Sequence, residues 1–191
     1  MLKVYYSDIS DLQVPDDEIS LLSNERREYI KSIKNEKSRK QSYYVWLLLE
    51  RAVNELFPDG NNFNYCVSEG KWECVGNPFY FGLSHSCDIV AVALSDTDSV
   101  GIDVERISDK IIKLKEKLLK ASEKEYFKSN KGKNNEAEKL TFIWCRKESR
   151  YKRGKDGIFS EFTVCGNNSE EYSLIVCGNR QCDEISKITL K

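Results

Sequence analysis

The chain has 191 residues, with 30 Lys and Arg against 31 Asp and Glu and a net charge of −1. This balance gives no electrostatic reason to expect a nucleic acid or an anionic membrane as a partner. The length suits one domain of ordinary size or two small lobes. The apolar run Trp46–Leu49 ends at charged residues, far short of a membrane span, so we expect no membrane association.

Cysteine usage indicates a reducing compartment. The seven cysteines are odd in number, contain no Cys-x-x-Cys pair and share the chain with a single histidine, so the spacing of zinc ligands is absent. Free thiols are typical of the cytosol, and residues 1–6 lack the features of a signal peptide. We therefore expect a cytoplasmic protein.

Apolar periodicity predicts mainly helices in the first third of the chain. We predict a strand at residues 2–6 and a turn at 14–17. Two short helical segments at 19–22 and 29–33 and a long helix at 36–57 follow. Pro58 and the polar residues after it break the long helix. Basic residues gather on these helices, among them Arg26, Arg27 and Arg39. Most such clusters are solvated helix faces.

Short strands follow the helices. They are predicted at residues 63–67, 79–84, 89–94 and 100–105, with polar turns between the later ones. This spacing predicts an antiparallel meander that carries Ser84 and His85 at one corner and an acidic strand next to it. Because Ser84 and His85 are adjacent on a strand, they point to opposite faces and do not suit a Ser/His nucleophile pair.

The strand at residues 100–105 carries a candidate metal site. Its alternation places Asp103 and Glu105 on one face and three apolar side chains on the other, toward a core. Gly101 allows a backbone or a ligand to approach closely. Two neighbouring carboxylates raise each other's pKa unless a cation lies between them, and Mg²⁺ prefers oxygen ligands. The alternative is an edge strand with a solvated acidic face.

The last part of the chain predicts helices and then strands. Helical patterns at 111–127 and around 142–152 flank a polar segment at 128–138, which we expect to be a mobile loop. Glu148 and Lys152 are four residues apart and share a helix face, as in many ordinary surface ion pairs. Strands are predicted at 159–165, 172–176 and 185–190. The whole pattern indicates a mixed α+β fold.

Three segments of the chain form a motif set when taken in order. They are Phe81-Gly82-Leu83-Ser84-His85-Ser86, Gly101-Ile102-Asp103-Val104-Glu105 and Trp144-Cys145-Arg146-Lys147-Glu148-Ser149-Arg150-Tyr151-Lys152, with Gly70-Lys71 upstream. Together they resemble the signature of the 4'-phosphopantetheinyl transferase superfamily, in its two-lobed, surfactin-synthetase-activating type. The resemblance implies a pseudo-dimer of two similar lobes with antiparallel sheets and packed helices. The N-terminal lobe, residues 1–98, would bind coenzyme A, and the C-terminal lobe, residues 99–191, would carry the metal and catalytic motifs.

The resemblance also implies an activity. A monomer would transfer the 4'-phosphopantetheine arm of coenzyme A to a serine of an acyl or peptidyl carrier protein, with Mg²⁺ or Mn²⁺ as cofactor, and release adenosine 3',5'-bisphosphate. The implied metal ligands are Asp103, Glu105 and Glu148. The implied catalytic residues are Glu148 and Lys152, and the implied coenzyme A contacts are Lys71, Ser84, His85 and Arg39. The sequence does not separate two roles for Glu148, metal ligand and general base.

Two departures from the family pattern concern the turn after Ser86 and the loop after Lys152. The resemblance implies that this loop borders the side where the carrier docks. Cys87 stands where the family usually has glycine, and the loop after Lys152 is about one residue shorter than usual. The alternative function is a non-catalytic coenzyme A or carrier-protein binder of the same fold, against which the intact acidic and basic residues argue. An unrelated Mg²⁺-dependent phosphohydrolase would need a Gly-rich phosphate loop or a further acidic cluster, and the sequence has neither.

Overall fold

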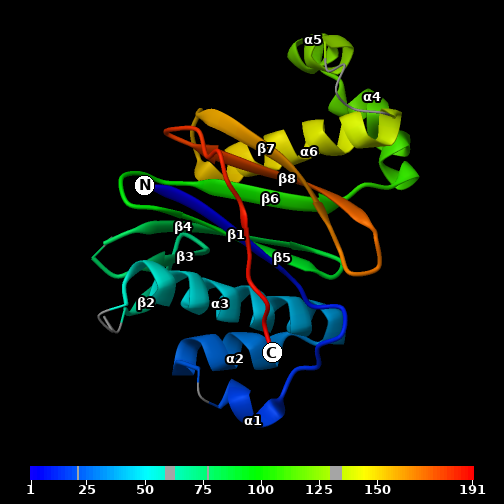
Figure 1. Ribbon diagram of the computed structural model, residues 1–191. Coiled ribbons are helices and arrows are strands. Elements are labelled where there is room, and N and C mark those ends of the chain that lie inside the picture. The colour runs from blue at the N-terminus through cyan, green and yellow to red at the C-terminus, as the bar shows by residue number, and fades with distance from the viewer. Residues whose placement is uncertain (21, 59–62, 77, 130–134) are drawn as a thin grey trace.

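The described residues form two larger β-sheets, with helices on their outer faces, and one small two-stranded sheet (Figure 1). The computed structural model describes residues 1–20, 22–58, 63–76, 78–129 and 135–191. Its elements, in chain order, are β1 (Leu2–Asp8), α1 (Asp16–Ile19), α2 (Asn24–Ser32), α3 (Glu36–Leu56), β2 (Tyr65–Ser68), β3 (Lys71–Cys74), β4 (Tyr80–Ser86), β5 (Ile89–Ser95), β6 (Gly101–Arg106), the 3₁₀ helix η1 (Asp109–Leu114), α4 (Lys115–Leu118), α5 (Ala121–Ser129), α6 (Glu136–Arg153), β7 (Ile158–Cys165), β8 (Glu171–Gly178) and β9 (Ser186–Lys187). The predicted α+β class is confirmed. Within the described ranges, no helix combines the length and the apolar character that crossing a membrane requires.

The first sheet contains β4, β5, β1 and β9, in that order. β5 pairs antiparallel with β4 and β1, whereas β9 pairs parallel with β1. Along β5, even-numbered residues from Val90 to Leu94 pack in the core under α3, and odd-numbered residues from Ile89 to Ala93 pack toward the second sheet. A strand that is buried on both faces is expected to be apolar throughout, as β5 is.

The second sheet contains β6, β8 and β7, with β8 in the middle and antiparallel to both neighbours. Its inner face shares a core with the first sheet, and α6 packs on its outer face through Phe142 and Cys145. The molecule is therefore layered as helices, sheet, sheet and helix (Figure 1). The predicted pseudo-dimer relation between two lobes is not tested by this layering and stays a prediction.

The C-terminal segment returns to the first sheet. The backbone N–H of Ile188 donates to Tyr6 O at 2.9 Å, and Leu190 is buried in the core under α3. The chain passes from one sheet to the other between β5 and β6, close to the predicted boundary after residue 98. The proposed division into residues 1–98 and 99–191 stays a prediction, with this tail crossing between the two parts.

Most of the predicted elements are present, with several differences. The predicted meander is wrong after β5, because residues 100–105 form β6, which pairs with β8 in the other sheet. The helical pattern at 111–127 is divided among η1, α4 and α5, and β9 is much shorter than the predicted strand at 185–190. The sequence pattern does not predict β3. Residues 130–134 of the expected mobile loop lie outside the described residues, and α6 begins near the end of that loop at Glu136.

One arginine of the basic cluster is buried in an aromatic cage. Arg26 on α2 is 2% exposed, and its guanidinium carbon lies 4.6 Å from the ring centre of Trp46. The ring centres of Tyr29 and Trp72 are 5.1 and 5.4 Å away. The Nη2 group of Arg26 donates to the backbone and hydroxyl oxygens of Ser42. Burial lowers the pKa of Arg26 to about 10, so this side chain joins α2, α3 and the β2–β3 hairpin as a buried cation.

We expect Arg26→Ala to lower the free energy of unfolding by about 3 kcal/mol, because a large buried side chain and its cation–π contacts are lost. Arg27→Ala is the matched control, since Arg27 lies on the same helix and bonds Ser20 and Asn24 at the surface. We expect this control to cost less than about 1 kcal/mol. Urea denaturation measures both, and equal losses would contradict the structural role of the cage.

The helix α6 crosses β6 at a point where only glycine fits. A Cβ atom on Gly101 would lie 1.9 Å from Ser149 O and 2.6 Å from Arg153 N, both in the α6 backbone. Gly82 on β4 is also crowded, with Val100 O at 3.1 Å from its Cβ position. The close approach that the sequence predicts at Gly101 is therefore confirmed, and the group that approaches is the backbone of α6.

We expect Gly101→Ala to destabilise the fold by about 3 kcal/mol, because overpacking forces α6 away from β6. Gly76→Ala serves as the control. Gly76 has a φ of +79° and open space around its Cβ position, so only the backbone penalty of about 1 kcal/mol applies. Thermal denaturation compares the two variants. A smaller loss for Gly101→Ala than for Gly76→Ala would show that α6 adapts without cost.

Candidate functional site

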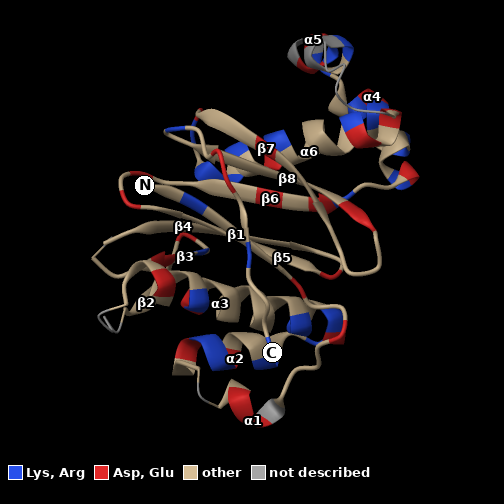
Figure 2. Cartoon of the chain, in the orientation of Figure 1, with Lys and Arg blue, Asp and Glu red and all other residues tan. Residues whose placement is uncertain are grey.

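The candidate site begins with β6, whose two faces differ. Ile102 and Val104 are fully buried in the core between the sheets, as predicted. Asp103 and Glu105 lie on the opposite face, with Asp103 only 5% exposed and Glu105 half-buried. In Figure 2, acidic segments mark β6, and basic segments follow along α6 beside it. The acidic face of β6 is therefore a mostly buried surface and not the solvated edge of the alternative hypothesis.

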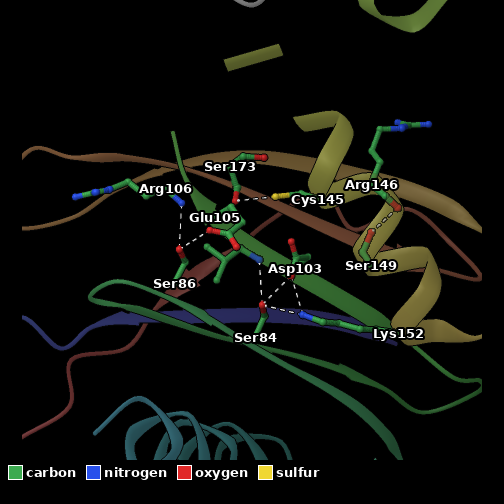
Figure 3. A network of polar contacts seen from close by, with 11 residues as sticks. Ser84, Ser86, Asp103, Glu105, Arg106, Cys145, Arg146, Ser149, Lys152 and Ser173 are labelled. Carbon is green, nitrogen blue, oxygen red and sulfur yellow. Dashed lines mark hydrogen bonds and ion pairs between the residues drawn. The ribbon is translucent and has the colours of Figure 1, made fainter. Parts of the chain in front are cut away.

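Two serines of β4 contact the carboxylates of β6 (Figure 3). Ser84 Oγ donates to Asp103 Oδ1 at 3.1 Å, and Ser86 Oγ donates to Glu105 Oε2 at 2.7 Å. The same hydroxyls accept the next backbone N–H groups of β6, those of Val104 at 3.1 Å and residue 106 at 3.3 Å. Because β4 and β6 belong to different sheets, side chains take the place of a backbone ladder along this edge of β6.

The helix α6 supplies a cation to the same cluster. Its first turn is capped by Asn135, whose side chain accepts the N–H of Glu138, and it ends at Gly154 with a φ of 84°. In its last turn, Lys152 Nζ lies 2.7 Å from Asp103 Oδ1 and donates to Ser84 Oγ at 3.1 Å (Figure 3). The structure therefore brings together Ser84, Asp103 and Lys152, which the motifs place far apart in the sequence.

The carboxylate pair retains unused acceptor capacity. Asp103 Oδ2 is buried and makes no hydrogen bond within the described residues. Burial, together with the neighbouring charge of Asp103, raises the pKa of Glu105 above its usual value. The buried thiol of Cys145 on α6 has its pKa raised by burial and by Asp103. A cation beside Oδ2 would satisfy this oxygen and reduce the repulsion, so these residues fit a divalent metal ion.

Glu148, the third predicted ligand, is half-buried on α6 one turn before Lys152. Over the described ranges, no group of three His, Cys, Asp or Glu side chains has the spacing of a metal site. Mg²⁺ is often bound through one or two carboxylates, with substrate phosphates and water completing the shell. Metal ligation by Asp103, Glu105 and Glu148 stays a prediction.

A cavity of about 230 Å³ adjoins the cluster. Its lining includes Lys71, Trp72, Phe81, Gly82 and Lys152. Lys71 Nζ donates to Lys152 O at 3.1 Å, which links the β2–β3 hairpin to the C-terminal end of α6. Aromatic walls and two lysines suit an anionic ligand with an apolar or aromatic part.

His85 lies near the C-terminal end of β4, and Arg39 lies in the first turn of α3. His85 is exposed while Ser84 is buried, as the strand alternation predicts. The surrounding protein and the Lys152 ammonium lower the pKa of His85 below its usual value. Arg39 is half-buried near the start of α3, and its Nε has no hydrogen-bond partner within the described residues. Contacts of Lys71, Ser84, His85 and Arg39 with coenzyme A stay predictions.

The turn after His85 keeps the shape that a glycine would give it. Cys87 has a φ of 51°, in the left-handed region. Its carbonyl oxygen accepts a hydrogen bond from Gln41 on α3 at 2.9 Å. Cysteine therefore replaces the usual glycine without opening the turn, at the cost of some backbone strain.

Sequence reasoning gave no role to Ser86 or Cys145. A signal exists for Ser86, because Ser84-x-Ser86 has the same two-residue period as Asp103-x-Glu105, so the two pairs can face each other across adjacent strands. No local signal exists for Cys145, since its position beside Asp103 depends on how α6 packs on the second sheet.

Part of the chain matches a known protein family. The sequence model of the 4'-phosphopantetheinyl transferase superfamily matches residues 99–189, a segment that contains both β6 and α6. No curated protein matches the chain. Members of this superfamily are transferases that use coenzyme A as a substrate. The match supports the resemblance that the motifs indicate, and it extends over residues 99–189, slightly less than half of the chain.

Proposed function

We propose that the chain transfers the 4'-phosphopantetheine arm of coenzyme A to a serine of an acyl or peptidyl carrier protein and releases adenosine 3',5'-bisphosphate. The observation that carries the proposal is the cluster of Asp103, Glu105 and Lys152 beside a cavity that Lys71 also lines. Phosphoryl transfer requires a positioned nucleophile and compensation of charge on the phosphoryl oxygens. The lysines beside this cavity would compensate the negative charge, and the carboxylates would hold a metal ion that positions the reacting groups.

Asp103 and Glu105 are the side chains that would hold Mg²⁺, or Mn²⁺ in its place, with Glu148 as a third candidate. The unpartnered Asp103 Oδ2 and the raised pKa of Glu105 support this assignment. When bound, the ion would supply Lewis-acid compensation for the negative charge of the diphosphate.

The cationic residues would bind the diphosphate side of the substrate. Lys152 has its ammonium at the carboxylate cluster, and Lys71 lines the same cavity. Glu148 would accept the proton of the carrier serine, directly or through water, or would serve as a metal ligand. His85, Arg39 and Ser84 are the candidate contacts for the nucleotide end. We propose a cytoplasmic monomer that acts on carrier proteins and has no nucleic acid or membrane partner.

The direct test is incubation of the chain with an apo carrier protein, coenzyme A and Mg²⁺, read by intact-mass spectrometry. We expect one phosphopantetheine per carrier. Asp103→Asn should slow the transfer by about a hundredfold or more, because the carboxylate that would hold the metal ion and that pairs with Lys152 is lost. Asp109→Asn, which removes an exposed carboxylate after β6, is the control and should leave the rate unchanged.

Several apo carriers that stay unmodified, while a control transferase labels them, would refute the proposal. Binding of coenzyme A without transfer would instead favour a non-catalytic binder of the same fold.

His85 provides a second test, on the nucleotide end. In the free protein we expect its pKa below the ordinary value of about 6.5, because its surroundings and Lys152 disfavour the imidazolium. Coenzyme A should raise this pKa, since a nearby phosphate favours the charged ring. The single histidine makes its NMR ring signals unambiguous. His85→Gln should raise KM for coenzyme A more than it lowers kcat. A titration that ignores coenzyme A would place His85 outside the nucleotide site.

A further inference from the structure

The serines of β4 and the carboxylates of β6 form two matching pairs. Ser84 bonds Asp103 and the backbone N–H that follows it, and Ser86 bonds Glu105 and the backbone N–H that follows that residue. Both pairs have a period of two residues, so the contact repeats along adjacent strands (Figure 3). Each hydroxyl therefore fixes both a carboxylate and the strand that carries it.

The hydroxyl of Ser84 has no bonding capacity left. A serine hydroxyl has one proton to donate and two lone pairs that accept. Its proton goes to Asp103 Oδ1, and its lone pairs accept from the backbone N–H of Val104 and from Lys152 Nζ. Ser84 is also 5% exposed. A ligand phosphate could bond this hydroxyl only after one of these three contacts is broken.

The two oxygens of Asp103 differ in their hydrogen bonds. Oδ1 accepts from Ser84 and Lys152, whereas the buried Oδ2 makes no hydrogen bond within the described residues. Because Oδ1 is held from two sides, turning the carboxylate away from this orientation breaks both contacts. Ser86 holds one oxygen of Glu105, Oε2, through a single hydrogen bond.

We infer that Ser84 and Ser86 are positioning residues, which orient the carboxylates of Asp103 and Glu105 toward a divalent cation. The inference rests on the proposed function, because it assumes that these carboxylates bind the metal. It replaces the candidate role of Ser84 at the nucleotide end with a role on the metal side of the site, which Ser86 shares, and it leaves the exposed His85 as the part of the Ser-His-Ser segment available to coenzyme A. Groups that hydrogen-bond metal ligands commonly change metal affinity by about 10- to 100-fold when they are removed.

The test measures Mn²⁺ affinity by electron paramagnetic resonance, with the full chain and without coenzyme A or carrier. Ser84→Ala should weaken Mn²⁺ binding about 10-fold or more, and Ser84→Thr, which keeps the hydroxyl, should restore most of it. Ser86→Ala should weaken binding in the same direction, and it tests the same claim if Ser84→Ala does not fold. Ser160→Ala is the matched control. Ser160 is a buried serine whose hydroxyl accepts the N–H of Cys182 at 2.7 Å in another part of the second sheet.

Unchanged Mn²⁺ affinity in folded Ser84→Ala and Ser86→Ala, with a raised KM for coenzyme A, would overturn the inference and return Ser84 to the nucleotide site. An equal loss of affinity in Ser160→Ala would also overturn it, because the effect would then follow from general destabilisation. If the wild-type chain transfers phosphopantetheine but binds no Mn²⁺ before coenzyme A is added, the positioning role fails while the proposed function stands. If it neither binds Mn²⁺ nor transfers the group, the proposed function fails as well.

Discussion

The carboxylate of Asp103 is buried where two sheets and a helix meet, and the rest of the site depends on how its charge is compensated. A buried ion is tolerated when it is paired and hydrogen-bonded. Asp103 Oδ1 obtains both from Lys152 and Ser84. Removing one partner of a fully buried pair costs about 3–5 kcal/mol. The Lys152 side chain is 35% exposed, so solvent screening reduces that cost here.

This ion pair also reduces the repulsion between the two carboxylates of β6. Simple repulsion between Asp103 and Glu105 would make the strand unfavourable, but each carboxylate has its own serine and Asp103 has an ammonium as well. The raised pKa of Glu105 follows first from burial and only second from Asp103. The cluster is therefore stable as a structural element while Asp103 Oδ2 remains unpartnered among the described residues.

Much of this arrangement follows from the sequence, where the signals are local. The period of two in β6 separates Asp103 from the core, the period of α6 places Glu148 and Lys152 on one face, and Gly101 marks the close approach. The sequence around β6 does not indicate that this strand pairs with β8. Serine side chains of β4 bond the edge of β6 where a meander would have backbone hydrogen bonds, and this contact depends on the tertiary fold. The sequence does not indicate the aromatic cage around Arg26 either. Its aromatic partners come from separate elements, so a basic residue on α2 looks like part of a solvated face until the hairpin with Trp72 packs against it.

The C-terminal end of α6 lies beside both groups of charged residues that the proposed reaction requires. These are the lysines that would bind the diphosphate and the carboxylates that would bind the metal ion. The last turn of a helix carries partial negative charge on its free carbonyl groups, which favours nearby cations. Lys71 binds one of these carbonyls, that of Lys152, and the Lys152 side chain reaches Asp103. One residue therefore contacts the hairpin through its backbone and the carboxylate cluster through its ammonium. A diphosphate in the cavity that both lysines line would lie beside the residue that pairs with Asp103. The close packing at Gly101 that fixes this helix is thus a requirement of the site as well as of the fold.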